Sequence, residues 1–117
     1  MTKRQVFPTQ RKAILIGKNA TVNAVLSQIS IDAAGVITPR GASIGTELEL
    51  QLELPAHGKF INLALQTKVI HHHNIKNQIY LQLEFQDLTS EEFKVLKAFL
   101  EYKQRLRDSG RKPDFFR

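Results

Sequence analysis

The sequence predicts a mainly β protein, a small antiparallel barrel of six or seven strands followed by one C-terminal amphipathic α-helix. Across residues 12–88, short apolar runs with period-two alternation are separated by turn residues. From residue 89 onward, apolar residues recur at helical spacing instead. Short strands at nearly regular intervals are typical of an antiparallel barrel or sandwich, so we expect one barrel domain with a terminal helix.

The composition is that of a soluble globular domain. The chain has 117 residues, of which 42% are hydrophobic and 24% are charged, and this is enough for one buried core. No apolar run is long enough to cross a bilayer, and the basic N-terminus lacks the apolar segment of a secretory signal. There are no cysteines, which excludes disulfides and thiolate chemistry. We therefore expect a cytoplasmic protein.

The formal net charge of +6 is concentrated at the two ends of the chain. Five basic residues precede the first acidic residue, Asp32, and six more follow residue 102. Such termini favour anionic partners: a nucleotide, nucleic acid, a membrane surface or an acidic protein patch. The alternative is that the basic ends only keep the protein soluble.

The first third of the chain predicts an arm followed by short strands. Residues 1–11 are basic, include Pro8 and lack periodicity, so we interpret them as a flexible arm. In the second expected strand the apolar pattern slips by one residue between Leu26 and Ile29, which indicates a β-bulge. The expected strands here are Lys12–Gly17, Ala20–Ile31 and Val36–Thr38.

The clearest strand is Thr46–Leu54, where leucines alternate with glutamate and glutamine without exception. One face of this strand is expected to be buried and the other wet. Pro55–Gly58 is expected to close it as a loop. Phe60–His72 and Ile79–Phe85 then predict two strands, which a hairpin turn joins.

The C-terminal part predicts one helix over residues 89–109. Thr89-Ser90-Glu91-Glu92 has the capping-box pattern, in which the first hydroxyl and the last carboxylate each bond the other residue's amide. Phe93, Leu96 and Leu100, with Phe99 as a further candidate, form an apolar stripe at helical spacing. Ser109-Gly110 is expected to end the helix.

The tail, residues 110–117, combines Phe115 and Phe116 with basic residues. It can fold back on the barrel, dock on a partner, or fray as termini often do. Exposing two phenylalanines is costly, and this favours docking.

The stretch from Ser30 to Ile37 is a polar corner in a mostly apolar sheet. Alternate residues of an extended segment face the same side, so Ser30 and Asp32 are expected to point together. Gly35 lets the backbone bend, or lets another group approach closely. The corner is therefore either a bulge or turn bonded to its own backbone, or a ligand site.

The order and spacing of these features resemble a PilZ domain, the small β-barrel that binds cyclic di-GMP in many bacterial proteins. The resemblance covers nearly the whole chain. It rests on the basic arm, Gly35-Val36-Ile37, Gly45-Thr46-Glu47-Leu48, Pro55, Leu83-Glu84-Phe85 and the C-terminal helix.

The resemblance implies a two-part ligand site, and both parts are altered here. The family's Arg-x-x-x-Arg in the arm is represented by Arg4 and Arg11, but Pro8 stands where the second arginine belongs. In the family's Asp/Asn-x-Ser-x-x-Gly, the acid and the hydroxyl are exchanged. The residues implied for cyclic di-GMP are Arg4, Arg11, Lys12, Ser30, Asp32 and Gly35.

In this reading the basic side chains meet phosphates, and Asp32 accepts the N–H groups of guanine. An arginine guanidinium that is misplaced loses about 1–3 kcal/mol of binding free energy per bidentate pair of hydrogen bonds. A loss of about 1.4 kcal/mol lowers the affinity tenfold. We therefore expect weak cyclic di-GMP binding or none. No other cofactor is implied.

The function expected from the resemblance is that of a non-enzymatic adaptor in cyclic di-GMP signalling, motility or surface behaviour, working through contact with a protein partner. The alternative is a small basic barrel that binds single-stranded nucleic acid. Aromatic residues suited to base stacking are few, 9 in all, so we do not expect nucleic acid as a partner. A third possibility is an inert structural subunit.

The run His71-His72-His73 invites a metal interpretation. Consecutive strand residues point to opposite faces, so at most His71 and His73 share one ion, and no cysteine is present. Since zinc requires several converging ligands, a solvated hairpin end is expected instead. His57 has no partner that would activate it and there is no nucleophile-elbow pattern, so no enzyme is expected.

Overall fold

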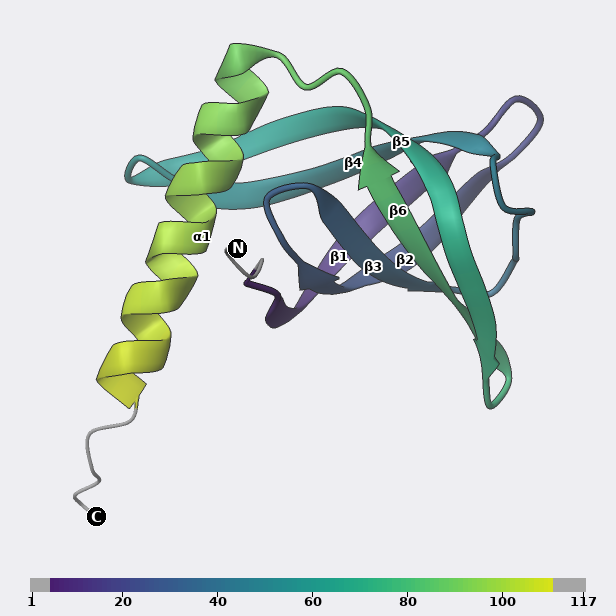
Figure 1. Cartoon of the computed structure of the whole chain (residues 1–117), viewed down its shortest axis with the longest axis horizontal. Helices are drawn as coiled ribbons and strands as arrows, with labels where there is room; N and C mark the ends of the chain where they lie inside the picture. Colours follow the sequence, from purple (N-terminus) through teal and green to yellow (C-terminus); the bar gives the residue numbers. More distant parts are fainter. Residues whose placement is uncertain (1–4, 111–117) are drawn as a thin grey trace, which may run out of the picture.

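The structure is a computed structural model that describes residues 5–110, which form six antiparallel strands and one helix (Figure 1). The strands close into a barrel in the order β1-β2-β3-β6-β5-β4. This confirms the predicted mainly β barrel with one C-terminal helix. The elements are β1 (Phe7–Ile16), β2 (Thr21–Ile29), β3 (Ala33–Thr38), β4 (Glu47–Ala56), β5 (Lys59–Ile75), β6 (Gln78–Phe85) and α1 (Ser90–Gly110).

Alternation along β4 fills the barrel interior as predicted. Leu50 and Leu54 are 0% exposed, whereas Glu47 and Glu53 face solvent. Fully burying a leucine side chain contributes about 1.5–3 kcal/mol, so this strand alone strongly favours one register. β4 continues beyond the predicted loop start, through Pro55 to Ala56.

The first strand begins at Phe7, so residues 7–11, which we predicted as part of the arm, belong to the barrel. Phe7 is buried and pairs with Ile29, and Pro8 pairs with Gln28. The pairing then shifts between Pro8 and Arg11. Proline has no amide proton to donate and is found at edges and bulges, which agrees with this shift. Burial in the segment alternates, but its inward positions include Thr9 and Arg11, so no apolar period-two pattern marks it. Only residues 1–4 of the predicted arm lie outside the described residues.

The bulge predicted in the second strand is present. Pairing between β2 and β3 shifts between Leu26 and Gln28. Leu26 and Ile29 are both 0% exposed, so the extra residue lets two side chains of different phase enter the same core. Gln28 consequently lies on the outer face of the barrel, where it is only partly buried.

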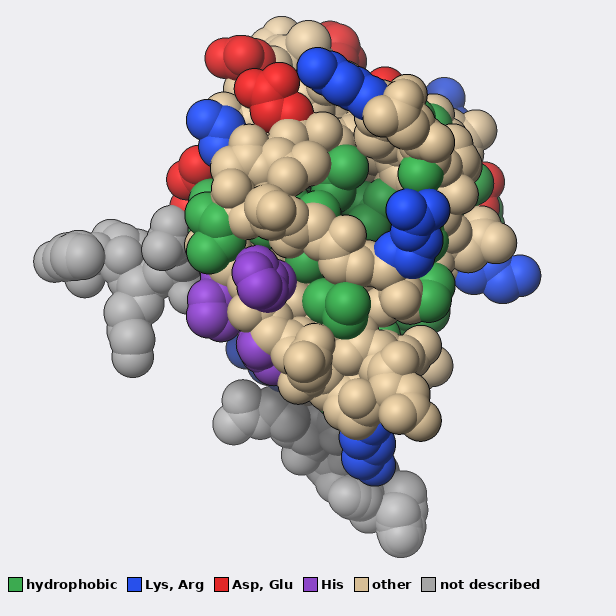
Figure 2. All heavy atoms as spheres, turned by 90° about the vertical axis from the view of Figure 1, so that its right-hand side faces the viewer, with side chains coloured by type: hydrophobic (Ala, Val, Ile, Leu, Met, Phe, Trp, Pro, Cys, Tyr) green, Lys and Arg blue, Asp and Glu red, His purple; other side chains and the backbone are tan. Residues whose placement is uncertain are grey.

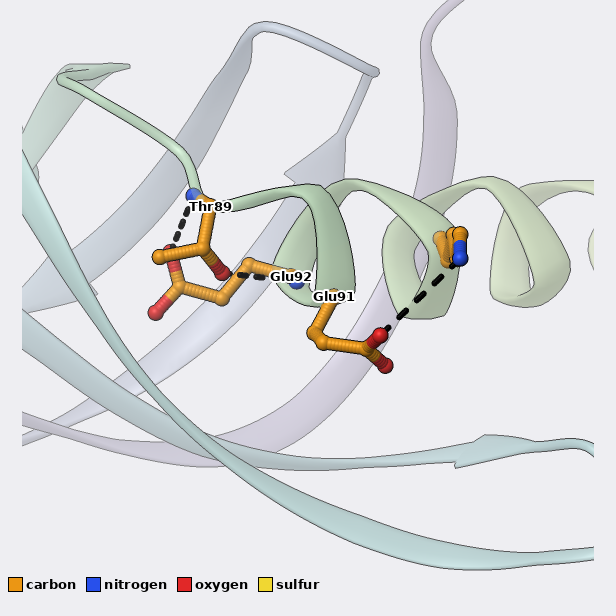
Figure 3. Close-up of polar contacts among 4 residues, drawn as sticks. Thr89, Glu91 and Glu92 are labelled. Atoms are coloured by element: carbon orange, nitrogen blue, oxygen red, sulfur yellow. Dashed lines mark hydrogen bonds and ion pairs between the residues drawn. The ribbon is translucent and has the colours of Figure 1, made fainter.

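The capping box at the start of α1 is confirmed (Figure 3). The Glu92 amide donates to Thr89 Oγ1 at 3.0 Å, and the Thr89 amide donates to Glu92 Oε1 at 3.0 Å. Glu91 also forms an exposed ion pair with Lys94 at 3.9 Å, which contributes little to stability. The two reciprocal hydrogen bonds satisfy amides at the helix end and position its first turn.

α1 packs against β4 and β5 through Val95, Leu96 and Phe99, all of which belong to the barrel core. The predicted stripe was wrong in one respect, because Phe93 is 44% exposed and Val95 takes its place. Among the described residues no helix combines the length and the apolar character that crossing a membrane requires.

Candidate functional site

The polar corner is a tight turn between β2 and β3. The Ser30 amide donates to the Ala33 carbonyl oxygen at 2.8 Å, and the Ala33 amide donates to Ser30 Oγ at 3.2 Å. Ser30 Oγ donates to Asp32 Oδ1 at 2.9 Å. Ser30 and Asp32 therefore do point together, through a turn rather than through alternate positions of a strand. Ser30 is buried at 4% exposure, and its hydroxyl bonds mainly within the turn.

This turn forms one side of a pocket of about 190 Å³ on the outer face of β2, β3 and β6. Its polar lining comprises Gln28, Ser30, Asp32, Gln82 and Glu84. The lining includes two carboxylates and, among the described residues, no lysine or arginine. The pocket therefore offers acceptors for N–H groups and no fixed positive charge for a phosphate.

Gly35 lines this pocket, and the Tyr80 side chain lies directly against it. A Cβ atom added at Gly35 would come within 2.7 Å of Tyr80 Cε1 and 2.8 Å of Gln28 Cγ. Only glycine fits such a close approach. The approach is made by Tyr80, so a side chain of the barrel itself occupies the space above Gly35.

Tyr80 is held on two sides. Gln28 Nε2 donates a hydrogen bond to Tyr80 Oη, and the His73 ring stacks on the tyrosine with 4.9 Å between centroids. Burial raises the pKa of the Tyr80 hydroxyl, while the hydrogen bond from Gln28 lowers it to a smaller degree. The phenol is therefore neutral near pH 7, and it adds no charge to the pocket.

The basic candidates do not line this pocket. Arg4 lies outside the described residues. Arg11 Nε donates to the Glu53 carbonyl oxygen at 3.2 Å, and the Arg11 guanidinium lies 5.9 Å from the centre of the Phe99 ring. Lys12 is exposed and lines separate hollows elsewhere on the barrel. The structure thus brings together Ser30, Asp32 and Gly35, but not the basic residues that we grouped with them.

β1 and α1 are joined by a second cation–π contact, in addition to the contact between Arg11 and Phe99. The Arg107 guanidinium of α1 lies 4.4 Å from the centre of the Phe7 ring of β1. Each element therefore supplies one arginine and one phenylalanine to the other, and this arrangement anchors the start of β1 to α1. Val6, the residue before Phe7, lines the pocket, so the anchored segment leads directly to the candidate site.

Four polar residues that line the pocket or cover Gly35 were not predicted from the sequence: Gln28, Tyr80, Gln82 and Glu84. Gly35 pairs with Gln28 on one side and with Gln82 on the other, and Tyr80 is two residues from Gln82 on the same outer face. The outward phase of β6 was visible in its alternation. The register of β6 against β3 places Tyr80 beside Gly35. It was not predicted, because it pairs residues that lie far apart in the chain.

The histidine run contributes a stacking partner for Tyr80. Figure 2 shows histidine side chains gathered at one side of the face, beside apolar ones. The His71 and His73 rings lie 5.6 Å apart. Within residues 5–110, no group of three or more histidine, cysteine or acidic side chains could hold a metal ion.

Comparison with known proteins identifies the family of this barrel. The family model described as PilZ domain matches residues 2–102. The structure resembles an inhibitor of motility (MotI/DgrA) from Bacillus subtilis, with 16% identity and a TM-score of 0.78, over 96% of this chain and 54% of that chain. It also resembles the PilZ domain of YcgR from Escherichia coli, solved with c-di-GMP, with 12% identity and a TM-score of 0.71, over 96% and 98% of the two chains.

A third neighbour is PlzA from Borreliella burgdorferi in complex with c-di-GMP, with 18% identity and a TM-score of 0.59, over 94% of this chain and 55% of that chain. This chain thus spans about half the length of MotI and of PlzA. No curated protein matches it by sequence. At these identities the structural neighbours support the fold, and the family model supports the membership.

Proposed function

The chain belongs to the PilZ domain family of cyclic di-GMP-binding signalling domains, and from that premise we propose that it is a non-enzymatic adaptor. It acts mainly through contact with a protein partner, and it binds cyclic di-GMP weakly or not at all. The likeness to an inhibitor of motility makes motility or surface behaviour the process that we propose it regulates.

The observation that carries this proposal is the position of Tyr80 over Gly35. A planar base that approaches the glycine must first displace the tyrosine ring. That displacement breaks the hydrogen bond from Gln28 and the stack on His73. Losing a neutral hydrogen bond costs about 0.5–1.5 kcal/mol, and losing an aromatic pair costs about as much again. Together they weaken binding by roughly ten- to hundredfold.

The charges at the pocket support the same conclusion. Cyclic di-GMP is a dianion, whereas Asp32 and Glu84 line the pocket. Arg11, the described residue at the family's phosphate position, instead contacts the Glu53 carbonyl and the Phe99 ring. To reach a phosphate it must give up both contacts, which join β1 to β4 and to α1. The remaining candidates for a phosphate contact are Arg4 and Lys12, and Lys12 lines other hollows of the barrel.

Asp32 retains one role in ligand binding under this proposal. A carboxylate accepts the paired N–H groups of a guanine edge well. In the present turn Asp32 Oδ1 already accepts from Ser30 Oγ. Guanine recognition therefore competes with a hydrogen bond of the turn, and this again lowers the expected affinity.

Titration calorimetry with cyclic di-GMP tests the proposal, on the full chain and on Asp32→Ala and Arg11→Ala. We expect little or no heat at high protein and ligand concentrations. Arg40→Ala is the matched control, since Arg40 is an exposed arginine in a turn away from the pocket. Micromolar binding that both test variants lose and the control keeps would overturn the weak-binding proposal.

The adaptor role is tested by quantitative pull-down with and without saturating cyclic di-GMP. We expect a partner that is recovered in constant proportion whether or not the nucleotide is present. Recovery that depends strictly on the nucleotide would instead indicate an ordinary ligand-controlled receptor.

A further inference from the structure

A groove of about 550 Å³ separates the tip of the β4–β5 hairpin from α1. In Figure 1 the hairpin tip projects past α1 on the left of the view. One wall is formed by residues 55–60 and the other by one side of α1, from Ala98 to Arg105. The groove is separate from the pocket at the polar corner, since the two share no lining residue.

The walls of this groove expose aromatic side chains. Phe60 is 63% exposed and Tyr102 is 38% exposed, and both line it. On α1 the buried residues Val95 and Phe99 are followed at helical spacing by Tyr102 and Leu106, which is 49% exposed. The apolar stripe of the helix thus continues past the part that the barrel covers. Clustered exposed apolar side chains of this kind mark interaction surfaces.

The charges at the groove indicate the chemistry of its partner. Lys59 and Arg105 line it and are exposed, and within residues 5–110 neither forms an ion pair. Among the residues that the structure describes, Glu101 is the single acidic residue of the lining. The excess of positive charge agrees with the net charge of +6 for the whole chain. A negatively charged partner is therefore attracted, and its charges complement two cations that form no ion pair with any described residue.

We propose that this groove binds an acidic peptide segment that presents a large apolar side chain. The apolar side chain packs between Phe60 and Tyr102, and the carboxylates meet Lys59 and Arg105. Aromatic residues and arginine are the types most enriched where interfaces gain their affinity. This inference names the class of partner for the adaptor role, and it does not depend on whether the pocket beside Gly35 binds a nucleotide.

The test is an NMR titration of the ¹⁵N-labelled full chain. The probe is a short synthetic peptide of glutamate and aspartate with a central Leu-Phe pair, and the comparison is the same peptide with lysine in place of every acid. We expect the acidic peptide to shift the amides of residues 59–60 and 101–105, and the lysine peptide to shift none. Added salt should weaken the binding, because the charged contacts are exposed.

Two variants and one control refine the test. Phe60→Ala and Arg105→Glu should each weaken binding of the acidic peptide by about tenfold or more. Ile44→Ala should leave it unchanged, because Ile44 is equally exposed at 63% but lies in the β3–β4 loop, outside the groove. Stability of each variant is checked by thermal unfolding, so that a folding defect is not mistaken for a binding defect.

Four results would overturn the proposal: no shifts at millimolar peptide, equal shifts with the lysine peptide, shifts that map elsewhere, or equal loss in the control. Groove shifts that depend on protein concentration alone would assign the groove to a second copy of the chain. Groove shifts caused by Phe115→Ser and Phe116→Ser, without peptide, would assign it to the chain's own tail. A calorimetric failure of the nucleotide proposal leaves all these readouts unaffected.

Discussion

The side-chain amide of Gln28 donates a hydrogen bond to the Tyr80 hydroxyl, and the tyrosine ring lies across Gly35 between β2 and β6. The space above this glycine, which the family resemblance assigns to a ligand, is thus filled by the Tyr80 side chain of the same barrel. A motif glycine permits close approach, but it does not specify which group approaches. In this chain the register of β6 against β3 determines the answer.

Removing the tyrosine ring should open the pocket. Tyr80→Ala is expected to raise the affinity for cyclic di-GMP about tenfold or more, because the ligand no longer has to break the Gln28 hydrogen bond and the His73 stack. Titration calorimetry measures the change. Tyr102→Ala is the control, since it removes the other of the two tyrosines of the chain at a distance from the pocket. An unchanged or lower affinity in Tyr80→Ala would show that the ring does not obstruct the ligand.

Placing a methyl group at Gly35 should destabilise the barrel. The added carbon of Gly35→Ala would lie within 2.7 Å of the Tyr80 ring, and such overpacking costs about 1–3 kcal/mol of unfolding free energy. Urea unfolding of the single variants and of the Gly35→Ala, Tyr80→Ala double variant forms a double-mutant cycle. We expect the double variant to be more stable than the sum of the two single effects predicts. Simple additivity would contradict the contact.

The buried phenol predicts a loss of stability in alkaline solution. The pKa of Tyr80 is raised above its ordinary value of 10.0, chiefly by burial. The unfolded chain therefore releases this proton at a lower pH than the folded one. The contribution of the neutral phenol is fully present below pH 10 and is lost as pH rises through the folded-state pKa.

Spectroscopic titration of tyrosine ionisation and unfolding at several pH values together test this expectation. Tyr80→Phe should flatten the alkaline part of the stability curve relative to the unmodified chain, and Tyr102→Phe should not. If both variants keep the same alkaline slope, lysines or other groups account for it and Tyr80 does not.

Much of the fold was predictable because its causes are local. The alternation of β4, the capping box at Thr89 and the phase slip after Leu26 each lie within a few residues of the structure that they determine. Phe7 was missed because the next inward positions of its strand carry the polar residues Thr9 and Arg11, so no apolar alternation marks the segment. Burial of Val95 instead of Phe93 depends on how α1 is rotated against β4, which the sequence pattern leaves open.

The candidate site was predictable only in part, for the same physical reason. Ser30 and Asp32 bond within one turn, so their proximity follows from their spacing. The cover that Tyr80 forms over Gly35 depends on pairing between distant strands. The same is true of Arg11, whose contacts with Glu53 and Phe99 join β1 to β4 and α1. The motif comparison assigned Arg11 to a ligand, whereas in the structure its guanidinium contacts the Glu53 carbonyl and the Phe99 ring.

The contact between Arg107 and Phe7 should hold the start of β1 in place. Phe7 is 3% exposed, and the Arg107 guanidinium lies 4.4 Å from the centre of its ring. Arg107→Ala is expected to lower the unfolding free energy by about 0.5–1 kcal/mol, the range for a cation–π contact at an exposed site. Because this contact ties the first residue of β1 to α1, hydrogen exchange at the start of β1 should accelerate more than in β4. Arg105→Ala is the control, since Arg105 lies two residues before Arg107 on α1, and it should leave hydrogen exchange in β1 unchanged. Equal exchange of β1 in the two variants would show that strand pairing alone anchors this segment, and that α1 does not communicate with the pocket through Phe7.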